Sequence, residues 1–263
     1  MPPVRIEHHE PGVAVVILDD PDRRNAMTVE MGDALKAAAV ELQDDADLRA
    51  VVVTGQPPAF SGGGDLGMLE DLARRTREEG FDATETMREF YARFLTLREL
   101  DVPVIAAVNG HAVGAGLCAA LACDLLLVAD DAKVGLNFAK LGLHPGMGGS
   151  WLLPAAVGRQ QAARLLYTGR LISGAEAAEI GMALESLPKE DVLPAALRLA
   201  EEIAEASPVV VRQLKQTLGD PAGDLDAALA REAACQAVNY GTEDLREGLS
   251  AGRERRSATF TGR

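Results

Sequence analysis

The sequence predicts an α/β core followed by a layer of helices, and three observations lead to this prediction. Short β-branched runs alternate with helical patterns in the first part of the chain. Beyond residue 190 the pattern is helical throughout. Apolar residues make up 48% of the 263 residues, which is enough for a sizeable core. We therefore expect residues 1–190 to form the core and residues 191–263 to form a helical region.

Four strands of the core are predicted from short apolar runs that are bounded by turn-forming residues. Residues 13–18 lie between Pro-Gly and Asp-Asp-Pro, which is typical of a buried strand. Residues 50–54, 104–108 and 125–129 follow the same pattern. Because strand, crossover helix and strand recur, this part of the chain reads as an α/β core.

Helices are predicted from capping residues and from apolar residues at helical spacing. Thr28 is a residue type that caps helix N-termini, and an amphipathic pattern follows it. A second amphipathic pattern runs from residue 87 to residue 100. Residues 70–83 are charged and lack a strong period, so we expect a mobile segment there. Further helices are expected at residues 192–206, 208–218, 225–240 and 243–255.

The charge balance narrows the class of partner. The chain carries 40 acidic and 26 basic residues, and its formal net charge is −14. This charge disfavours nucleic acid or an anionic membrane surface as the main partner. An anionic small ligand remains possible where local cations outweigh the global field. Arginine suits such a ligand because its guanidinium binds phosphate or carboxylate in a bidentate way.

Cysteine and histidine usage points to a cytoplasmic chain without a metal site. The three cysteines, Cys118, Cys123 and Cys235, form no CxxC pair, so we expect free thiols in a reducing cytoplasm. The four histidines and three cysteines show no metal-ligand spacing. The N-terminus has no apolar signal core, and the longest weakly polar stretch, residues 112–129, is interrupted by Asp124. We therefore expect no membrane insertion.

Glycines at residues 114–119 allow a dinucleotide-binding interpretation. Gly114, Gly116 and Ala119 match G-x-G-x-x-A, and Asp130 follows at the end of the next predicted strand. This pattern is typical of an NAD(P)-dependent dehydrogenase. However, residues 109–113 separate the glycines from the preceding strand, whereas the motif normally follows its strand directly.

A second interpretation pairs two glycine-rich loops, residues 62–64 and 114–116, which both lie beyond a predicted strand. Each loop lets the backbone pass close to a ligand with its N–H groups exposed. Two such peptides facing one oxygen would form an oxyanion hole for a thioester carbonyl. The glycines alone also fit two tight turns that bind no ligand.

Several segments together resemble the crotonase, or enoyl-CoA hydratase/isomerase, superfamily. They occur in the family's order across nearly the full length of the chain. The matching segments are RNAM at 24–27, AFSGGGDL at 59–66, VIAAVNGHAVGAG at 104–116, ACD at 122–124, LGLHPG at 141–146 with Gly148 and Gly149, TGR at 168–170, and EDLREG at 243–248 with the tail to Phe260.

The resemblance implies a fold and a ligand. It implies a spiral of β-β-α turns with a C-terminal helical trimerisation region, assembled as a homotrimer or a homohexamer. It implies an acyl-CoA thioester whose oxygen sits between the backbone N–H groups of Gly64 and Ala115. Coenzyme A would be part of the substrate, with no separate cofactor. The residues that would contact it are Arg23, Arg24, Ala26, Ala59, Gly62, Asp65 and Leu66, while Leu117 and Phe138 would line the acyl pocket.

The sequence departs from the family at both positions that carry catalytic glutamates in its hydratases. Those positions are occupied here by Cys118 and Phe138. Hydration needs a base for water and an acid for the α-carbon, and phenylalanine can be neither. We therefore do not expect ordinary hydratase activity.

Two residues remain as candidates for an acid or base. Cys118 would lie in the first turns of a helix, whose dipole favours a thiolate; alternatively it is a small buried residue. His144 lies in a glycine-rich loop and could exchange protons near neutral pH, or it could simply bond to the backbone.

Three functions fit these residues. The first is an enzyme of the hydratase/isomerase type, a lyase or isomerase, whose acid–base group has moved. The second is an acyl-CoA decarboxylase, which needs no strong base. The third is a non-catalytic acyl-CoA binder. Phe138 favours the second and third, because an apolar wall replaces a carboxylate.

Overall fold

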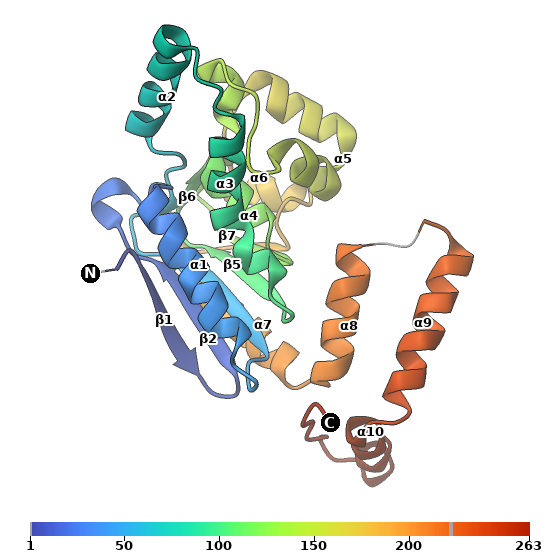
Figure 1. Cartoon of the computed structure of the whole chain (residues 1–263). Helices are drawn as coiled ribbons and strands as arrows, with labels where there is room; N and C mark the ends of the chain where they lie inside the picture. Colours follow the sequence, from blue (N-terminus) through green and yellow to red (C-terminus); the bar gives the residue numbers. More distant parts are fainter. Residues whose placement is uncertain (1, 221–222) are drawn as a thin grey trace.

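The main sheet has six strands, and it forms the centre of the molecule (Figure 1). The computed structural model describes residues 2–220 and 223–263. The first strand pairs antiparallel with the second, and all other neighbours are parallel. In spatial order the strands are β1 (Val4–His9), β2 (Val13–Leu18), β3 (Ala50–Gly55), β5 (Val104–Val108), β7 (Leu125–Ala129) and β10 (Glu185–Leu187).

A smaller second sheet repeats the order of the first. Its strands are β4 (Ala59–Ser61), β6 (His111–Val113), β8 (Lys133–Gly135) and β9 (Ile172–Ser173). The chain passes from β3 to β4, from β5 to β6 and from β7 to β8. It returns to the main sheet through α2 (Leu66–Glu79) and α3 (Thr84–Leu95), and then through α4 (Ala115–Leu121). After β8, α5 (Gly149–Thr168) leads to β9, and α6 (Gly174–Glu179) leads from there to β10. The expected spiral of β-β-α turns is confirmed.

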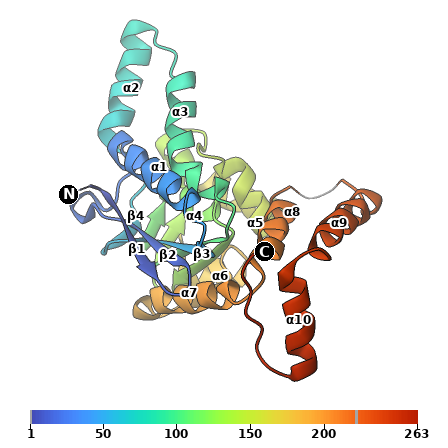
Figure 2. The same cartoon turned by 60° about the horizontal axis from the view of Figure 1, so that its bottom comes forward.

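Two helices cover opposite faces of the main sheet (Figure 2). On one face lies α1 (Val29–Gln43), whose N-terminus is capped as expected, since Thr28 Oγ1 accepts a hydrogen bond from the Met31 N–H at 3.1 Å. On the other face lies α7 (Lys189–Ala204), which packs across β2, β3, β5 and β7. All residues of β2, β3 and β5 are buried between these layers. The hydrophobic core therefore includes residues of α7, among them Val192, Ala196 and Ala200.

The charged segment at residues 70–83 lies mostly within α2, so the expectation of a mobile segment missed this helix. Asp65 Oδ1 caps the helix by accepting the Met68 N–H at 2.7 Å. Gly80, in the left-handed conformation, ends it. Arg74 pairs with Asp71 at 2.7 Å along the helix surface. No residue of α2 is fully buried, and its apolar face is limited to the half-buried Met68, Leu69 and Leu72 in the first two turns.

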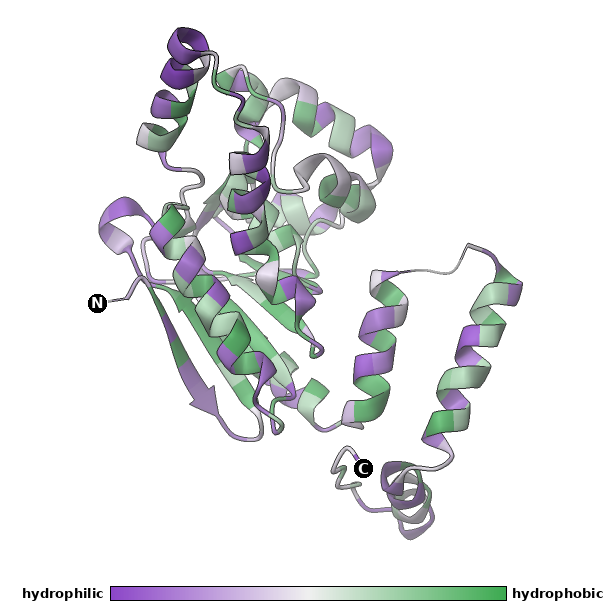
Figure 3. Cartoon of the chain, viewed as in Figure 1, coloured by the Kyte–Doolittle hydropathy of each residue, from purple (hydrophilic) through white to green (hydrophobic). Residues whose placement is uncertain are grey.

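Three helices at the C-terminus extend away from the sheets (Figures 1 and 2). They are α8 (Pro208–Gly219), α9 (Leu225–Asn239) and α10 (Glu243–Glu254), each within one residue of its predicted bounds. Hydrophobic residues alternate with hydrophilic ones along these helices (Figure 3). The large exposed ones are Leu214, Leu218, Leu225, Leu229, Val238 and Leu249.

A buried carboxylate holds the C-terminal tail in place. Asp244 is 2% exposed and accepts hydrogen bonds from the Ser207 hydroxyl at 2.8 Å and the Thr261 N–H at 2.7 Å. Since Ser207 immediately precedes α8, one side chain joins the start of α8, α10 and the tail. These hydrogen bonds hold α10 and the tail against the start of α8.

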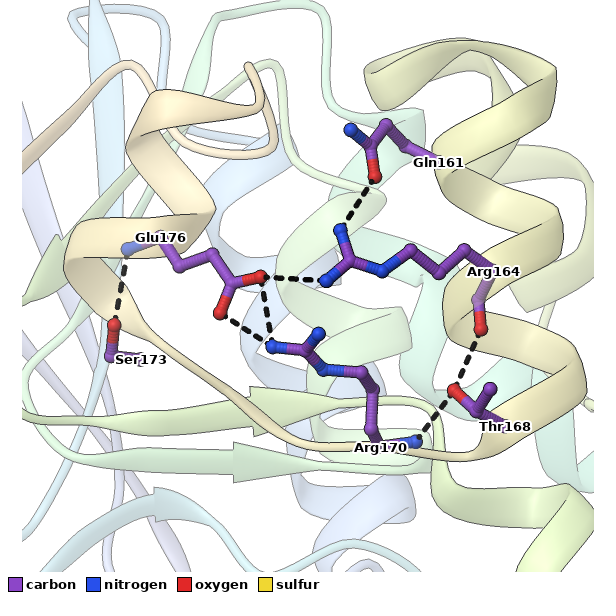
Figure 4. Close-up of polar contacts among 6 residues, drawn as sticks. All are labelled: Gln161, Arg164, Thr168, Arg170, Ser173 and Glu176. Atoms are coloured by element: carbon purple, nitrogen blue, oxygen red, sulfur yellow. Dashed lines mark hydrogen bonds and ion pairs between the residues drawn. The ribbon is translucent and has the colours of Figure 1, made fainter.

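The segment 168–170 leads from α5 into β9, the edge strand of the second sheet, and takes part in a network of polar contacts (Figure 4). Arg170 donates to both oxygens of Glu176, at 2.9 and 2.7 Å, and Arg164 of α5 lies 3.7 Å from the same carboxylate. Thr168 Oγ1 donates to the Arg164 carbonyl at 2.6 Å. Glu176 belongs to α6 (Gly174–Glu179), so the network ties the end of α5 to the start of α6 and fixes β9 between them.

Candidate functional site

The two glycine-rich loops lie against each other in the structure. They follow β4 and β6, which are parallel neighbours, so both loops leave the same edge of the second sheet. A methyl group placed on Gly63 would lie 2.5 Å from the Val113 carbonyl oxygen and 3.7 Å from the Ala115 nitrogen. Gly63 also has φ +97°, a conformation that favours glycine. Contact between the loops therefore requires glycine at this position.

Two amide groups at this contact have no partner within residues 2–220 and 223–263. Neither the Gly64 N–H nor the Ala115 N–H donates a hydrogen bond there, whereas the Gly63 N–H donates to Ser61 Oγ at 3.2 Å. Ala115 is the first residue of α4, so its N–H lies before the first intrahelical bond. The arrangement can present two backbone donors to one ligand oxygen.

A buried asparagine, which the sequence analysis did not single out, shapes the first loop. Asn25 is fully buried, and its Nδ2 donates to the carbonyls of Gln56 at 2.9 Å, Ala59 at 2.7 Å and Phe60 at 3.2 Å. Its own carbonyl accepts the Ser61 hydroxyl at 2.8 Å. The signal in the sequence is its place in the RNAM segment. Its role comes from contacts with residues more than 30 positions away.

Replacing Asn25 by alanine is expected to lower the free energy of unfolding by about 2–4 kcal/mol, because several buried carbonyls would lose their donor. Urea unfolding followed by circular dichroism measures this loss. Asn137→Ala is a control, since Asn137 is half-buried and forms no side-chain hydrogen bond among the described residues. Equal stability of the two variants would contradict the role of Asn25.

The two arginines beside this turn differ in their partners. Arg23 pairs with Asp20 at 2.7 Å and with Glu30 at 3.7 Å. Arg24 has no ion pair within the described part of the chain, and its side chain is exposed. Its carbonyl accepts the Gly62 N–H at 2.8 Å, which places Arg24 next to the first glycine loop. Arg24 is therefore the freer of the two cations near the candidate site.

The other residues expected to contact coenzyme A lie on the same loop and turn. Ala26 is half-buried, Ala59 is buried in β4, and Gly62 is exposed. Asp65 serves as the cap of α2, while Leu66 is 65% exposed at its start. The structure gathers these residues on the loop and turn next to the Gly64 amide.

Cys118, the first of the two positions where the family resemblance implies a glutamate, lies one helical turn beyond Ala115 in α4. Its side chain is 0% exposed, and Sγ donates to the Gly146 carbonyl at 3.4 Å. Burial raises the pKa of the Cys118 thiol to about 12. A methyl group placed on Gly149 would lie 2.9 Å from Sγ, so the loop packs directly onto the sulfur. These surroundings favour the buried thiol over the thiolate.

The second departure, Phe138, lies in a 3-10 helix, η3 (Asn137–Leu141). It is half-buried, and its ring edge comes within 3.8 Å of a methyl group placed on Gly114. The ring therefore forms an apolar wall beside the Ala115 amide. Leu117, also expected in the pocket, is 1% exposed and belongs to the hydrophobic core.

The two histidines beside the glycine loops bond to the backbone. His144 is exposed, and its Nδ1 lies 2.9 Å from the Pro145 carbonyl oxygen. His111 Nδ1 accepts the Lys133 N–H at 2.9 Å, which joins β6 to β8. The structure thus favours the backbone-bonded interpretation of His144.

A tyrosine from α3, Tyr91, packs against the loop at residues 142–149, close to Cys118. A methyl group placed on Gly146 would lie 2.5 Å from the Tyr91 hydroxyl oxygen. Burial raises the pKa of Tyr91, and proximity to Cys118 raises it further. In the sequence Tyr91 appears only as one member of an apolar helix face. Its position beside Cys118 comes from the packing of α3 against the loop at residues 142–149.

The dinucleotide interpretation finds no support in the geometry. The strand directly before Gly114 is β6 of the small sheet, and a methyl group on Gly116 would lie 2.7 Å from the Ser61 carbonyl oxygen. Gly116 thus serves the close packing of α4 on β4. Among residues 2–220 and 223–263, no group of three His, Cys, Asp or Glu side chains could hold a metal ion. No helix in those ranges combines the length and apolar character needed to cross a membrane.

Known proteins share both the sequence pattern and this architecture. The family model for enoyl-CoA hydratase/isomerase matches residues 8–263. The chain is 37% identical over 249 residues to an enoyl-CoA hydratase of Thermus thermophilus, covering 94% of this chain and 97% of that protein. It is 35% identical over 252 residues to a probable enoyl-CoA hydratase of Mycobacterium bovis, covering 95% of each.

Solved structures agree with these sequence matches. A crystal structure of an enoyl-CoA hydratase from Bacillus anthracis has a TM-score of 0.88 at 31% identity, covering 99% of this chain and all of that one. An enoyl-CoA hydratase/isomerase from Mycobacterium abscessus has a TM-score of 0.91 at 28% identity, with coverage of 99% and 100%. The chain therefore belongs to the enoyl-CoA hydratase/isomerase family of the crotonase superfamily.

Proposed function

We propose that this protein binds an acyl-CoA thioester and stabilises the enolate formed from it between the Gly64 and Ala115 N–H groups. The observation that carries the proposal is the pair of unpartnered amides at the contact of the two glycine loops. A donor aimed at the developing oxyanion supplies about 3 kcal/mol of transition-state stabilisation. The names of the relatives support an acyl-CoA ligand.

The proposed chemistry uses no resident carboxylate base. The positions of the two hydratase glutamates hold a buried thiol and an aromatic ring, and the pKa of that thiol is raised to about 12. Neither group takes a proton from water at neutral pH. The site therefore supports enolate stabilisation better than hydration of a double bond.

Decarboxylation is the second candidate, and Phe138 favours it. When the bond between the α-carbon and a carboxylate breaks, carbon dioxide leaves and the electron pair remains on the thioester enolate. The enolate then takes a proton from solvent. No base is needed, and an apolar wall favours the loss of charge at the leaving carboxylate.

Heavy-water exchange separates the candidates. Butyryl-CoA and malonyl-CoA are incubated separately with the protein in heavy water, and NMR follows the α-protons and the loss of carbon dioxide. Exchange on butyryl-CoA indicates an acid–base group and an enolate. Decarboxylation of malonyl-CoA without exchange supports the second candidate. Binding without either reaction indicates a non-catalytic binder, and failure of both thioesters to bind overturns the proposal.

Coenzyme A phosphates are proposed to bind Arg24 more than Arg23, because Arg23 already pairs with two carboxylates. Arg24→Ala is expected to weaken binding of coenzyme A about tenfold, through loss of a charge-assisted hydrogen bond. Arg23→Ala is the matched control and is expected to change the affinity less than threefold. Titration calorimetry at low and high salt measures both variants. A larger loss in Arg23→Ala would contradict the assignment.

The helices α8–α10 are proposed to assemble the chain into a homotrimer or homohexamer. Large apolar side chains on α8 and α9 remain exposed in the single chain. Exposed apolar side chains that lie together are typical of a surface that binds another protein chain. Sedimentation equilibrium tests this proposal, because a trimer has three times the chain mass of 27.7 kDa. A species of single-chain mass at micromolar concentration would contradict it.

A further inference from the structure

Tyr91 brings a hydroxyl group next to the loop at residues 142–149. It lies on α3, whose neighbouring side chains Phe90 and Phe94 are buried in the core. Tyr91 itself is half-buried, and its hydroxyl is directed at Gly146. Any side chain at residue 146 would collide with the phenol ring, since a methyl group there would lie 2.5–2.9 Å from three of its atoms. Gly146 thus makes room for this hydroxyl.

The hydroxyl lies beside the position where the acyl group of a bound thioester would begin. Cys118 is one turn along α4 from Ala115, and its sulfur donates to the carbonyl of Gly146. Tyr91 therefore meets the same residue, Gly146, as Cys118, which lies one helical turn beyond the proposed oxyanion donor Ala115. Phe138 forms the apolar wall on the side of Gly114.

The Tyr91 hydroxyl also has no partner of its own. It forms no hydrogen bond with any residue in the described part of the chain, and it is not among the fully enclosed polar atoms without a partner. Burial raises its pKa, so the phenol stays protonated at neutral pH and acts as a donor. The thiol of Cys118 donates to a carbonyl, which leaves the phenol as the side-chain donor available to a ligand here.

We infer that the Tyr91 hydroxyl donates a hydrogen bond to an oxygen on the β-carbon of the acyl group, and that the site selects acyl-CoA thioesters that carry such an oxygen. This inference rests on the proposed function, since it assumes that the thioester oxygen lies at Gly64 and Ala115. A site built around a donor discriminates against ligands without the matching acceptor, because the donor is then left unpaired.

Acetoacetyl-CoA and butyryl-CoA test this inference, because they differ at the β-carbon by a carbonyl oxygen. Titration calorimetry is carried out on the wild-type protein, on Tyr91→Phe, and on Tyr167→Phe as a control with an exposed tyrosine on α5. Tyr91→Phe is expected to bind acetoacetyl-CoA about tenfold more weakly while its affinity for butyryl-CoA changes less than twofold. Tyr167→Phe is expected to bind both as the wild type does.

A merely structural role for Tyr91 would weaken binding of both thioesters equally, and that result would overturn the inference. Unchanged affinity of Tyr91→Phe for acetoacetyl-CoA would overturn it as well. In both cases butyryl-CoA still binds the wild-type protein, so acyl-CoA binding stands and the heavy-water assay still decides the proposed function. If acetoacetyl-CoA alone does not bind the wild-type protein, only the inference is overturned. If neither thioester binds, the inference and the proposed function are both overturned.

Discussion

Replacing Ala115 by proline is expected to slow the reaction of the wild-type protein, whether α-proton exchange or decarboxylation, by about 10²–10³-fold. Proline has no N–H, so the variant keeps only the Gly64 donor. Ala115 is the first residue of α4, which is the helical position where proline is best tolerated. The loss is therefore expected in the rate, with the affinity for coenzyme A itself changed less than threefold.

Ala115→Gly is the matched control, because it removes the methyl group and keeps the N–H. Its rate is expected to stay within about threefold of wild type. The NMR exchange and decarboxylation assays give the rates, and calorimetry with free coenzyme A gives the affinity. A wild-type rate in Ala115→Pro, or an equal loss in both variants, would contradict the assignment of Ala115 as an oxyanion donor.

The main sheet could be predicted from sequence because its central strands are buried on both faces. β2, β3, β5 and β7 are continuous apolar runs between turn-forming residues, and each was expected at its observed place. The strands of the second sheet have two or three residues each, too few to show a pattern. Only pairing with one another identifies them.

The helices likewise divide into those that the sequence predicts and those that it does not. α1, α3 and the C-terminal helices bear caps or apolar faces that the sequence displays. α5 was not predicted, since Pro154 lies inside it and Gly158 interrupts its helical geometry. α2 has no fully buried residue, and the Asp65 cap and surface ion pairs add to the packing of its half-buried Met68 on the core.

The candidate site was predictable where its residues act through the backbone. Glycine-rich loops mark Gly64 and Ala115 directly in the sequence. Asn25 and Tyr91 were not identified, because each meets the site through contacts with residues more than 30 positions away. Cys118 likewise contacts Gly146 and Gly149, which lie about 30 positions further along the chain. The sequence alone therefore does not predict whether residue 118 is a thiol or a thiolate.

Replacing Cys118 by glutamate, the residue of the family's hydratases, is expected to lower the free energy of unfolding by more than about 3 kcal/mol. The sulfur is fully buried, and the loop at Gly146 and Gly149 packs directly onto it. A longer, charged side chain has no room there, and among the described residues no cation lowers the pKa of the group at this position. It would have to bury an unpaired carboxylate or displace the loop.

Two further variants show whether the cost is specific to this position. Cys118→Ala leaves a small void and is expected to lose about 1 kcal/mol. Phe138→Glu places a carboxylate at a half-buried position of η3 and is expected to cost less than Cys118→Glu. Urea unfolding at pH 7 measures all three. Wild-type stability of Cys118→Glu would show that the loop accommodates the carboxylate.

The stability of Cys118→Glu also bears on the proposed loss of the two hydratase glutamates in this chain. If the departure were two independent substitutions, restoring both glutamates would give hydration of an enoyl-CoA. In this chain Gly149 packs directly on the sulfur, so a glutamate at residue 118 has to displace the loop before it can act. We therefore expect the double variant Cys118→Glu, Phe138→Glu to be less stable than Phe138→Glu and to lack hydratase activity. Hydration of an enoyl-CoA by the double variant would contradict this expectation.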